Sequence, residues 1–269
     1  MKIGNREFDT QHHTYVCGIL NVTPDSFSDG GKWNDMDRAL KHVEEMLKEG
    51  MTLLDIGGES TRPGYTLLSD EEEIARVVPV IEAVKARFDV PISLDTYKSA
   101  VAEEGLKAGA DLINDIWGLK WDDKMASVIA GSGAACCLMH NRKEAVYHNF
   151  LEDMTLDLTQ TLQIAEKAGI ADDRIILDPG VGFGKTREHN LSVIKHLEMF
   201  RLLNYPILLG CSRKSVIGLT LDLPVQERLE GTLVTTVMAV MKGCAFVRVH
   251  DVKENVRAVR MAEAILESL

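Results

Sequence analysis

One pattern recurs eight times along this chain: a short apolar run, a polar or glycine-rich loop, and an amphipathic helical stretch. The apolar runs are nearly continuous, as expected for parallel strands that are buried on both faces. Eight such units in about 250 residues are typical of a (β/α)₈ barrel. The sequence therefore predicts a single TIM-barrel domain over residues 1–269, and an open, doubly wound sheet is the alternative fold.

The expected strands and helices alternate along the chain. We expect strands at 15–20, 53–56, 92–94, 112–113, 134–139, 175–177, 207–209 and 245–249. Helical spacing of apolar side chains predicts helices at 36–48, 70–87, 99–108, 123–129, 150–168, 190–203, 225–242 and 252–266. Ser69 and Glu72 predict a capping box before the second helix, whereas Pro79 predicts a kink or break within it. Residues 1–14 predict a short hairpin that caps or plugs the body.

The composition argues against several classes of function. The 269 residues carry a net charge of −11, which disfavours nucleic acid as a partner. No apolar run approaches the roughly 18 residues of a membrane span, so we expect no membrane partner. The first residues have no signal-peptide core. The five cysteines all fall in apolar runs, so we expect reduced, buried thiols in a cytoplasmic protein.

The most informative side chains follow the apolar runs. In a (β/α)₈ barrel the carboxyl ends of all strands open on one mouth, so polar residues there converge. The candidates are Asn21, Glu59, Ser60, Thr61, Arg62, Asp95, Asn114, His140, Asp178, Ser212, Arg213, Lys214, Arg248 and His250. Carboxylates and an amide at three strand ends suit a flat heterocycle with several N–H donors and a carbonyl; they are Asp95, Asn114 and Asp178.

Cations gather at the same mouth of an acidic protein. The Arg248 guanidinium could stack on a planar ring while Lys214 bonds the ring carbonyl. Arg62, Arg248 and His250 suit a phosphate or diphosphate. The first apolar run ends at Asn21, whose amide oxygen could ligate the Mg²⁺ that such an anion brings.

Seven motifs, in order along the chain, carry a family resemblance. They are Gly18–Gly31, Asp55–Gly64, Ser93–Thr96, Ile113–Asp115, Asp178–Lys185, Gly210–Lys214 and Arg248–Asp251. Together they resemble the dihydropteroate synthase family of folate biosynthesis over nearly the whole chain. The resemblance implies a pterin-binding barrel and a transferase. Its reaction would join 6-hydroxymethyl-7,8-dihydropterin diphosphate to 4-aminobenzoate, releasing diphosphate and forming dihydropteroate.

The resemblance also implies a role for each matching position. The expected pterin-binding residues are Asp95, Asn114, Asp178, Phe183 and Lys214, with Arg248 stacked on the ring. The expected diphosphate-binding residues are Thr61, Arg248 and His250, with Mg²⁺ on Asn21. The expected aminobenzoate pocket consists of Phe27, Arg62, Pro63 and Ser215. Catalysis would rest on Asp95, Lys214, Arg248 and His250, through a pterin carbocation formed as diphosphate departs, and the family suggests a homodimer.

Two other functions fit parts of the pattern. A pterin-dependent methyltransferase of the corrinoid type shares the barrel and the Asp/Asn pocket, but should lack the Ser-Thr-Arg-Pro loop and the Arg-Val-His end that are present here. A non-catalytic pterin-binding barrel would need no second pocket. Asp115 and Asp251 are interpreted as caps or ion-pair partners, while the roles of His140 and Lys185 stay open.

Overall fold

The computed structural model describes residues 1–22, 31–59 and 67–268. Eight parallel strands lie side by side in the order β8-β7-β6-β5-β4-β3-β10-β9. Their bounds are β3 (Tyr15–Asn21), β4 (Leu53–Gly57), β5 (Ile92–Asp95), β6 (Leu112–Asp115), β7 (Ala135–Met139), β8 (Ile175–Asp178), β9 (Leu208–Leu209) and β10 (Phe246–Val249). A parallel bridge between Leu177 and Ile207 brings the two ends of the sheet together. The predicted (β/α)₈ barrel is confirmed, and the open sheet is excluded.

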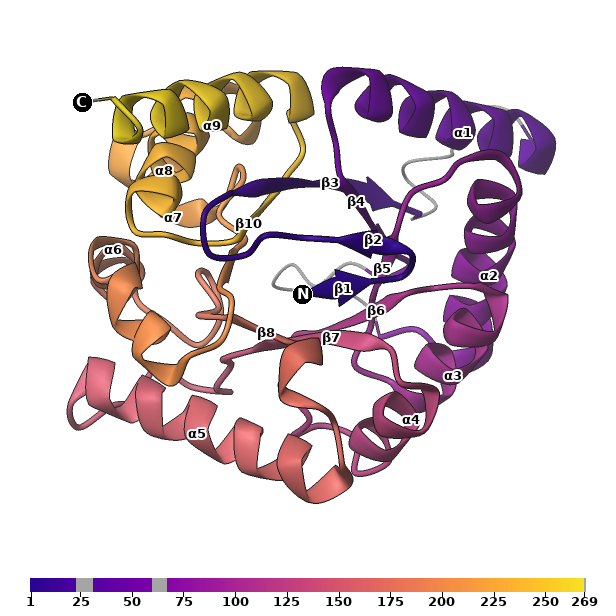
Figure 1. Cartoon of the computed structure of the whole chain (residues 1–269), viewed down its shortest axis with the longest axis horizontal. Helices are drawn as coiled ribbons and strands as arrows, with labels where there is room; N and C mark the ends of the chain where they lie inside the picture. The colour runs from indigo at the N-terminus through magenta and orange to yellow at the C-terminus, as the bar shows by residue number, and fades with distance from the viewer. Residues whose placement is uncertain (23–30, 60–66, 269) are drawn as a thin grey trace.

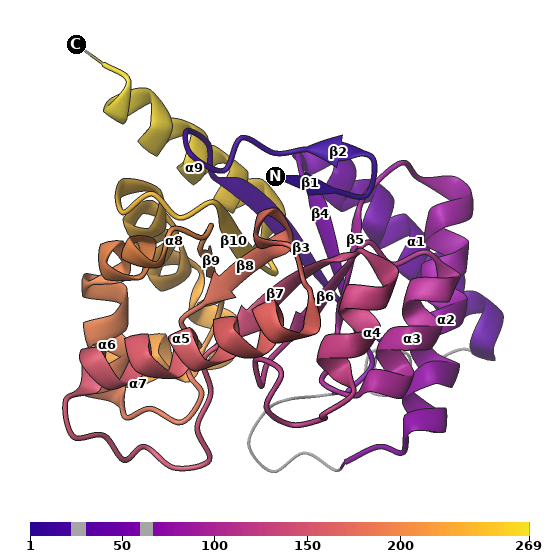
Figure 2. The same ribbon diagram turned by 60° about the horizontal axis from the view of Figure 1, so that its bottom comes forward.

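Helices surround the strands on the outside (Figures 1 and 2). Their bounds are α1 (Gly31–Glu49), α2 (Asp70–Arg87), α3 (Ser99–Ala108), α4 (Met125–Ser132), α5 (Phe150–Ala168), α6 (Arg187–Lys195), α7 (Ser215–Leu221), α8 (Leu229–Met241) and α9 (Val252–Leu266). Short 3₁₀ turns lie at η2 (Asp172–Arg174), η3 (Leu197–Leu203) and η4 (Val225–Glu227). None of these helices is long and apolar enough to cross a membrane.

Two helices differ from the sequence-based expectation. The helix expected at 190–203 is α6 followed by the 3₁₀ turn η3. The two are separated at His196, the C-cap of α6, whose ring bonds the Ser192 carbonyl. The helix expected at 225–242 starts at Leu229, and the shorter α7 precedes it. Gly218 within α7 lets the Arg228 guanidinium pack closely, since a Cβ at that position would lie 2.2 Å from Arg228 Nη2.

The second helix runs unbroken through Pro79. Its capping box is present: Ser69 Oγ accepts from the Glu72 amide and the Glu72 carboxylate accepts from the Ser69 amide. The predicted break at Pro79 is wrong, because α2 extends on both sides of the proline. Val77 and Ile81 are fully buried on either side of it. We attribute the continuity to this packing, which compensates for the missing amide hydrogen bond.

The interior of the barrel has an apolar floor. The predicted hairpin consists of β1 (Lys2–Ile3) and β2 (Arg6–Glu7), and Figure 1 shows it lying across the end of the barrel. Its side chains Ile3 and Phe8 are buried against one residue from most strands, in a cluster that includes Cys17, Leu53, Leu112, Ala135, Cys137, Ile176, Leu208 and Phe246. The hairpin therefore plugs the amino-terminal end.

The same strands place polar side chains one layer above this floor. Successive residues of a strand point to opposite faces, so the residue two positions after each floor residue also points inward. Counted from the strand residues of that cluster, these positions are Ile19, Asp55, Asn114, Cys137, Met139, Asp178, Gly210 and Arg248, of which Asp55, Asn114, Asp178 and Arg248 are polar. Apolar side chains therefore close one end of the barrel, and a charged layer faces the other.

Candidate active site

Arg248 lies at the centre of the polar layer and is held by two carboxylates. Its Nε donates to Asp55 Oδ2 at 2.6 Å and its Nη2 to Asp95 Oδ2 at 2.7 Å. Burial opposes the charged guanidinium, but the two carboxylates outweigh it and raise the pKa of Arg248. Burial, together with the second carboxylate, raises the pKa of Asp95 to about 7, although Arg248 opposes the shift. One cation shared by the buried Asp55 carboxylate and the partly buried Asp95 carboxylate fixes the plane of the guanidinium.

Asp55 is a site residue that sequence reasoning missed. It is buried, accepts from Ser93 Oγ at 2.5 Å, and lies 3.4 Å from Asn114 Nδ2. These contacts connect β4, β5 and β6 with Arg248 on β10 across the barrel. The signal was present in the sequence: an aspartate inside an apolar run, two positions after an inward-facing leucine, is a buried charge that needs a partner.

Asp178 and Lys214 face each other on the neighbouring part of the mouth. A Cβ at Gly210 would lie 3.5 Å from Asp178 Oδ2 and 3.7 Å from Lys214 Nζ, so the glycine leaves room between them. Lys214 Nζ donates to the Val181 carbonyl at 2.5 Å and lies 4.8 Å from the centre of the Phe183 ring. Burial raises the pKa of Asp178 against the opposing effect of Lys214, and burial lowers the pKa of Lys214 against that of Asp178.

His250 and its surroundings form the rim next to Arg248. Its Nδ1 lies 3.0 Å from Ser212 Oγ, which also accepts from the His250 amide at 3.2 Å. Arg213 pairs with Asp251, so Asp251 has the predicted ion-pair role. Ser215 is exposed at the first position of α7. Asp115 accepts from the amides of the turn after β6, as a capping residue does.

Asn21 is the one described position at which Mg²⁺ is predicted. A Cβ at Gly57 would lie 3.9 Å from Asn21 Oδ1 and 3.7 Å from Asp95 Oδ2, so the amide borders the charged layer. Within the described ranges, no group of three or more His, Cys, Asp or Glu side chains could hold a metal by itself. A single hard oxygen donor fits an ion that keeps several waters and shares substrate phosphates.

The structure thus brings most of the predicted residues to one mouth: Asn21, Asp95, Asn114, Asp178, Phe183, Lys214, Arg248 and His250. Four others lie outside the described residues, namely Phe27, Thr61, Arg62 and Pro63. Their predicted roles in binding diphosphate and aminobenzoate therefore stay predictions.

Comparison with known proteins agrees with this geometry. Residues 17–250 match the pterin binding enzyme family. The dihydropteroate synthase of Clostridium beijerinckii is 59% identical over 267 residues, which cover 99% of each chain. This chain belongs to the dihydropteroate synthase family. It is accordingly an enzyme, and a transferase.

Two solved dihydropteroate synthases extend the likeness to three dimensions. The Clostridium difficile enzyme, solved in the presence of pteroic acid, has a TM-score of 0.95 and 48% identity, covering 97% of this chain and all of that one. The Xanthomonas albilineans enzyme with 4-aminobenzoic acid has a TM-score of 0.91 and 39% identity, covering 96% and 94%. The shared barrel includes the strands that carry the charged layer.

Apart from Phe183, an apolar wall of the dihydropteroate synthase mouth also escaped sequence reasoning. Ile116, Met139 and Tyr97 are buried together, with Trp117 and Phe183 packed against them. Met139 is the last residue of β7, and the others follow β5, β6 and β8, near Asp95, Asn114 and Asp178 in the chain. A flat ring held by the polar groups would therefore also meet apolar side chains. The inward-facing position of Met139, two residues after Cys137, was the signal for it.

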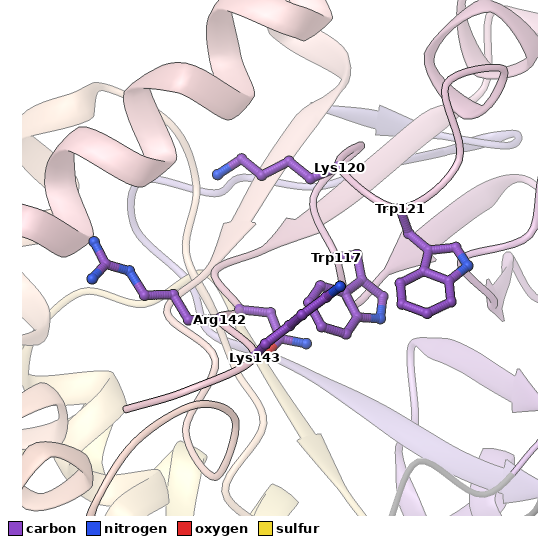
Figure 3. Close-up of a pocket in the computed structure, with 6 residues that line it drawn as sticks. Trp117, Lys120, Trp121, Arg142 and Lys143 are labelled. Carbon is purple, nitrogen blue, oxygen red and sulfur yellow. The ribbon is translucent and has the colours of Figure 1, made fainter. Parts of the chain in front are cut away.

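A separate hollow of about 420 Å³ lies between the segments that follow β6 and β7. Figure 3 shows Trp117 and Trp121 beside each other in it, and their ring centres are 5.2 Å apart. Two of its cations already have protein partners on α5: Lys120 Nζ donates to the Asp157 carbonyl and Arg142 Nε to the Asp157 carboxylate. Hydrogen bonds to α5 therefore fix two side chains of this hollow, which lies beside the pterin-binding mouth.

Proposed function

We propose that this chain joins 6-hydroxymethyl-7,8-dihydropterin diphosphate to 4-aminobenzoate, forming 7,8-dihydropteroate and releasing diphosphate. The observation that carries the proposal is the set of Asp55, Asp95, Asn114, Asp178 and Lys214 at the carboxyl ends of the strands, of which Asp55, Asn114 and Asp178 are buried and Asp95 and Lys214 partly buried. Acceptors for several ring N–H groups stand opposite one cationic donor for a ring carbonyl, a pattern that matches a pterin. The relatives named above, including one with pteroic acid and one with 4-aminobenzoic acid, support the same substrates.

The pterin would lie over Arg248. Asp178 and Asn114 would accept from its N–H groups, and Lys214 would donate to its carbonyl. Because Asp55 and Asp95 hold the guanidinium at 2.6 and 2.7 Å, its plane is fixed before substrate arrives. A fixed plane lowers the entropy lost when a flat ring stacks on it.

The diphosphate would extend toward Thr61, Arg248 and His250. The Ser212 hydroxyl contacts both the ring and the amide of His250, which orients the imidazole. Asn21 is proposed to hold Mg²⁺, which would offset negative charge on the leaving diphosphate. Phe27, Arg62, Pro63 and Ser215 are proposed to line the aminobenzoate pocket.

The reaction is proposed to proceed by dissociation. The C–O bond to diphosphate breaks first, its electron pair leaves with the diphosphate, and the exocyclic carbon becomes a cation that the pterin ring stabilises. Arg248 and His250 offset the charge that grows on the leaving group, and Asp95 and Asp178 favour the cationic ring. The amine of 4-aminobenzoate then attacks the carbon and loses a proton. No covalent bond to the protein forms.

The decisive assay measures diphosphate release from the pterin substrate with Mg²⁺, with and without 4-aminobenzoate. Release that depends on the amine, with dihydropteroate formed in equal amount, is expected. Binding of the pterin diphosphate without amine-dependent release would favour the non-catalytic barrel. The dihydropteroate synthases similar to this chain argue against that alternative. Positional isotope exchange in the bound diphosphate without amine tests the cation, and exchange should be detectable if the bond breaks first.

Two further expectations complete the proposal. We propose a homodimer formed through the outer helices, which sedimentation velocity would test by a mass twice that of the chain. We also propose that the enzyme works in the cytoplasm, in agreement with its free, buried cysteines. The methyltransferase alternative loses support because the relatives reported above are dihydropteroate synthases.

A further inference from the structure

Lys185 is enclosed at the edge of the mouth and is not a solvated loop charge. Its Nζ donates to the Gly180 carbonyl at 2.9 Å and to the Phe183 carbonyl at 3.0 Å, and lies 2.9 Å from His140 Nδ1. A protonated lysine has three N–H donors and no acceptor. The ammonium therefore satisfies all three neighbours at once, and two of them belong to the loop that ends in Lys185 itself.

His140 completes this arrangement from the end of β7. Its side chain is fully buried, and its Nε2 lies 3.0 Å from Asp157 Oδ2, which also accepts from Arg142 Nε at 2.6 Å. A carboxylate only accepts, so Nε2 carries the hydrogen and Nδ1 is left to accept from Lys185. Burial lowers the pKa of His140 to about 4, although Asp157 opposes the shift, so the ring is neutral at pH 7.

The loop from Asp178 to Lys185 packs tightly on the segment that carries His140. A Cβ at Gly180 would lie 1.9 Å from the His140 carbonyl oxygen, and one at Gly184 would lie 2.3 Å from the Arg142 carbonyl oxygen. Both glycines have positive φ, at 70° and 54°. These two close backbone contacts can form only while the loop keeps this conformation.

This loop supplies three elements of the pterin site. Asp178 stands at its start, where its Oδ1 accepts from the Gly180 amide at 2.7 Å. The Val181 carbonyl accepts from Lys214 Nζ, and the Phe183 ring lies beneath that ammonium. A shift of the loop would therefore move the acceptor and the cation that face the pterin together.

We propose that the Lys185 ammonium, oriented by His140 and Asp157, is a positioning residue that holds the Asp178–Lys185 loop in its pterin-binding conformation. The inference rests on the proposed function, because it concerns the affinity of that site for pterin. Lys185 itself need not touch the substrate. Figure 3 shows Arg142 and Lys120 directed away from the two indoles, and both bond Asp157 on α5, the residue that orients His140.

The charge state of Lys185 makes this positioning of the Asp178–Lys185 loop sensitive to pH. Burial lowers the pKa of Lys185 to about 7; Lys214 and Arg142 add to the shift, whereas Asp178 and Asp157 oppose it. The groups that face Lys185 and its partner His140 from β7, β8, α5 and the adjoining segments are His140, Tyr147, Asp178, Asp157, Arg142, Lys120 and Lys214. A neutral amine has one donor fewer, so one of its three acceptors loses its hydrogen bond above that pH.

The test compares wild type with Lys185→Met and with the control Lys195→Met, which removes an exposed lysine from α6. The Kd for 6-hydroxymethyl-7,8-dihydropterin is measured by calorimetry from pH 6.0 to 8.5, and KM and kcat are measured in parallel. In Lys185→Met we expect a pterin Kd raised by about tenfold at pH 6.5, with kcat and the KM for 4-aminobenzoate within about twofold. Wild-type affinity should weaken as pH rises through about 7, and this pH dependence should shrink in Lys185→Met.

A folded Lys185→Met protein with the wild-type Kd and the wild-type pH profile overturns the inference. Should Lys185→Met fail to fold, His140→Met decides, because it removes one acceptor of the ammonium and leaves Lys185 in place. In His140→Met the pH profile of pterin binding should move to lower pH, and an unchanged profile overturns the inference. Absence of amine-dependent diphosphate release in wild type would count against the proposed function alone, since the pterin Kd is read without turnover.

Discussion

Lys214→Ala tests the pterin half of the site most sharply. The Lys214 ammonium lies opposite Asp178 across Gly210, with one hydrogen bond of 2.5 Å to the Val181 carbonyl. An ammonium has two further donors for a ring carbonyl. A hydrogen bond that involves a charged group contributes about 1.5–3 kcal/mol, and we take about 2 kcal/mol for its loss. That loss corresponds to an increase of about 30-fold in the Kd for pterin.

Isothermal calorimetry with 6-hydroxymethyl-7,8-dihydropterin measures this Kd directly. Lys167→Ala, which removes an exposed lysine near the end of α5, is the matched control and should leave it unchanged. Circular dichroism establishes that each variant is folded. A folded Lys214→Ala protein whose Kd lies within twofold of wild type would refute the assignment of Lys214 to the pterin carbonyl.

Three further predictions concern buried groups. Lys98→Met leaves Glu59 and Glu73 buried without the ammonium that bonds them at 2.8 and 2.7 Å, and should lower the free energy of unfolding in urea by about 3–5 kcal/mol; a change below about 1 kcal/mol contradicts this. The pKa of His140 is lowered to about 4 by burial, so its contribution to stability is present above the ordinary value near 6.5 and is lost as pH falls through 4. His140→Gln should flatten the decline of unfolding free energy between those pH values, and an identical decline would argue that His140 does not cause it. All five cysteines are free and buried, so a thiol reagent should react with none in the native protein and with five after denaturation; fast reaction of a native thiol is the contrary result.

The sequence alone was enough to predict the barrel and most of the mouth. Parallel strands buried on both faces leave near-continuous apolar runs, and the helices of the outer ring leave a clear helical period. Because all strands of such a barrel end on one mouth, residues as distant as Asp95 and Arg248 could be placed together before any contact was known. Their hydrogen bond of 2.7 Å agrees with that placement.

Other features depended on contacts that no local pattern contains. Pro79 stays within α2, with Val77 and Ile81 buried on either side of it, and tertiary packing of this kind can override local preference. The short helix α7 contains Gly218, which weakens its helical signal but makes room for Arg228. The enclosure of Lys185 requires β7, α5 and its own loop to meet, and its sequence neighbours alone predict a loop charge.

Asp55 is intermediate between these cases. Its position two residues after Leu53 was sufficient to place it inside the barrel, in line with the alternation of side chains along a strand. Its partners Arg248 and Ser93 come from other strands, and the pairing of these strands in one sheet brings them within 2.6 and 2.5 Å. Buried carboxylates inside predicted barrel strands therefore merit inclusion among candidate site residues.

The central claim is that side chains from separate strands surround one pterin ring. A crystal structure with pterin diphosphate, Mg²⁺ and an aminobenzoate analogue measures this directly. The ring should lie between Asp95, Asn114, Asp178 and Lys214, with its plane against Arg248. A pterin bound elsewhere, with these residues still paired only to one another, would contradict the account.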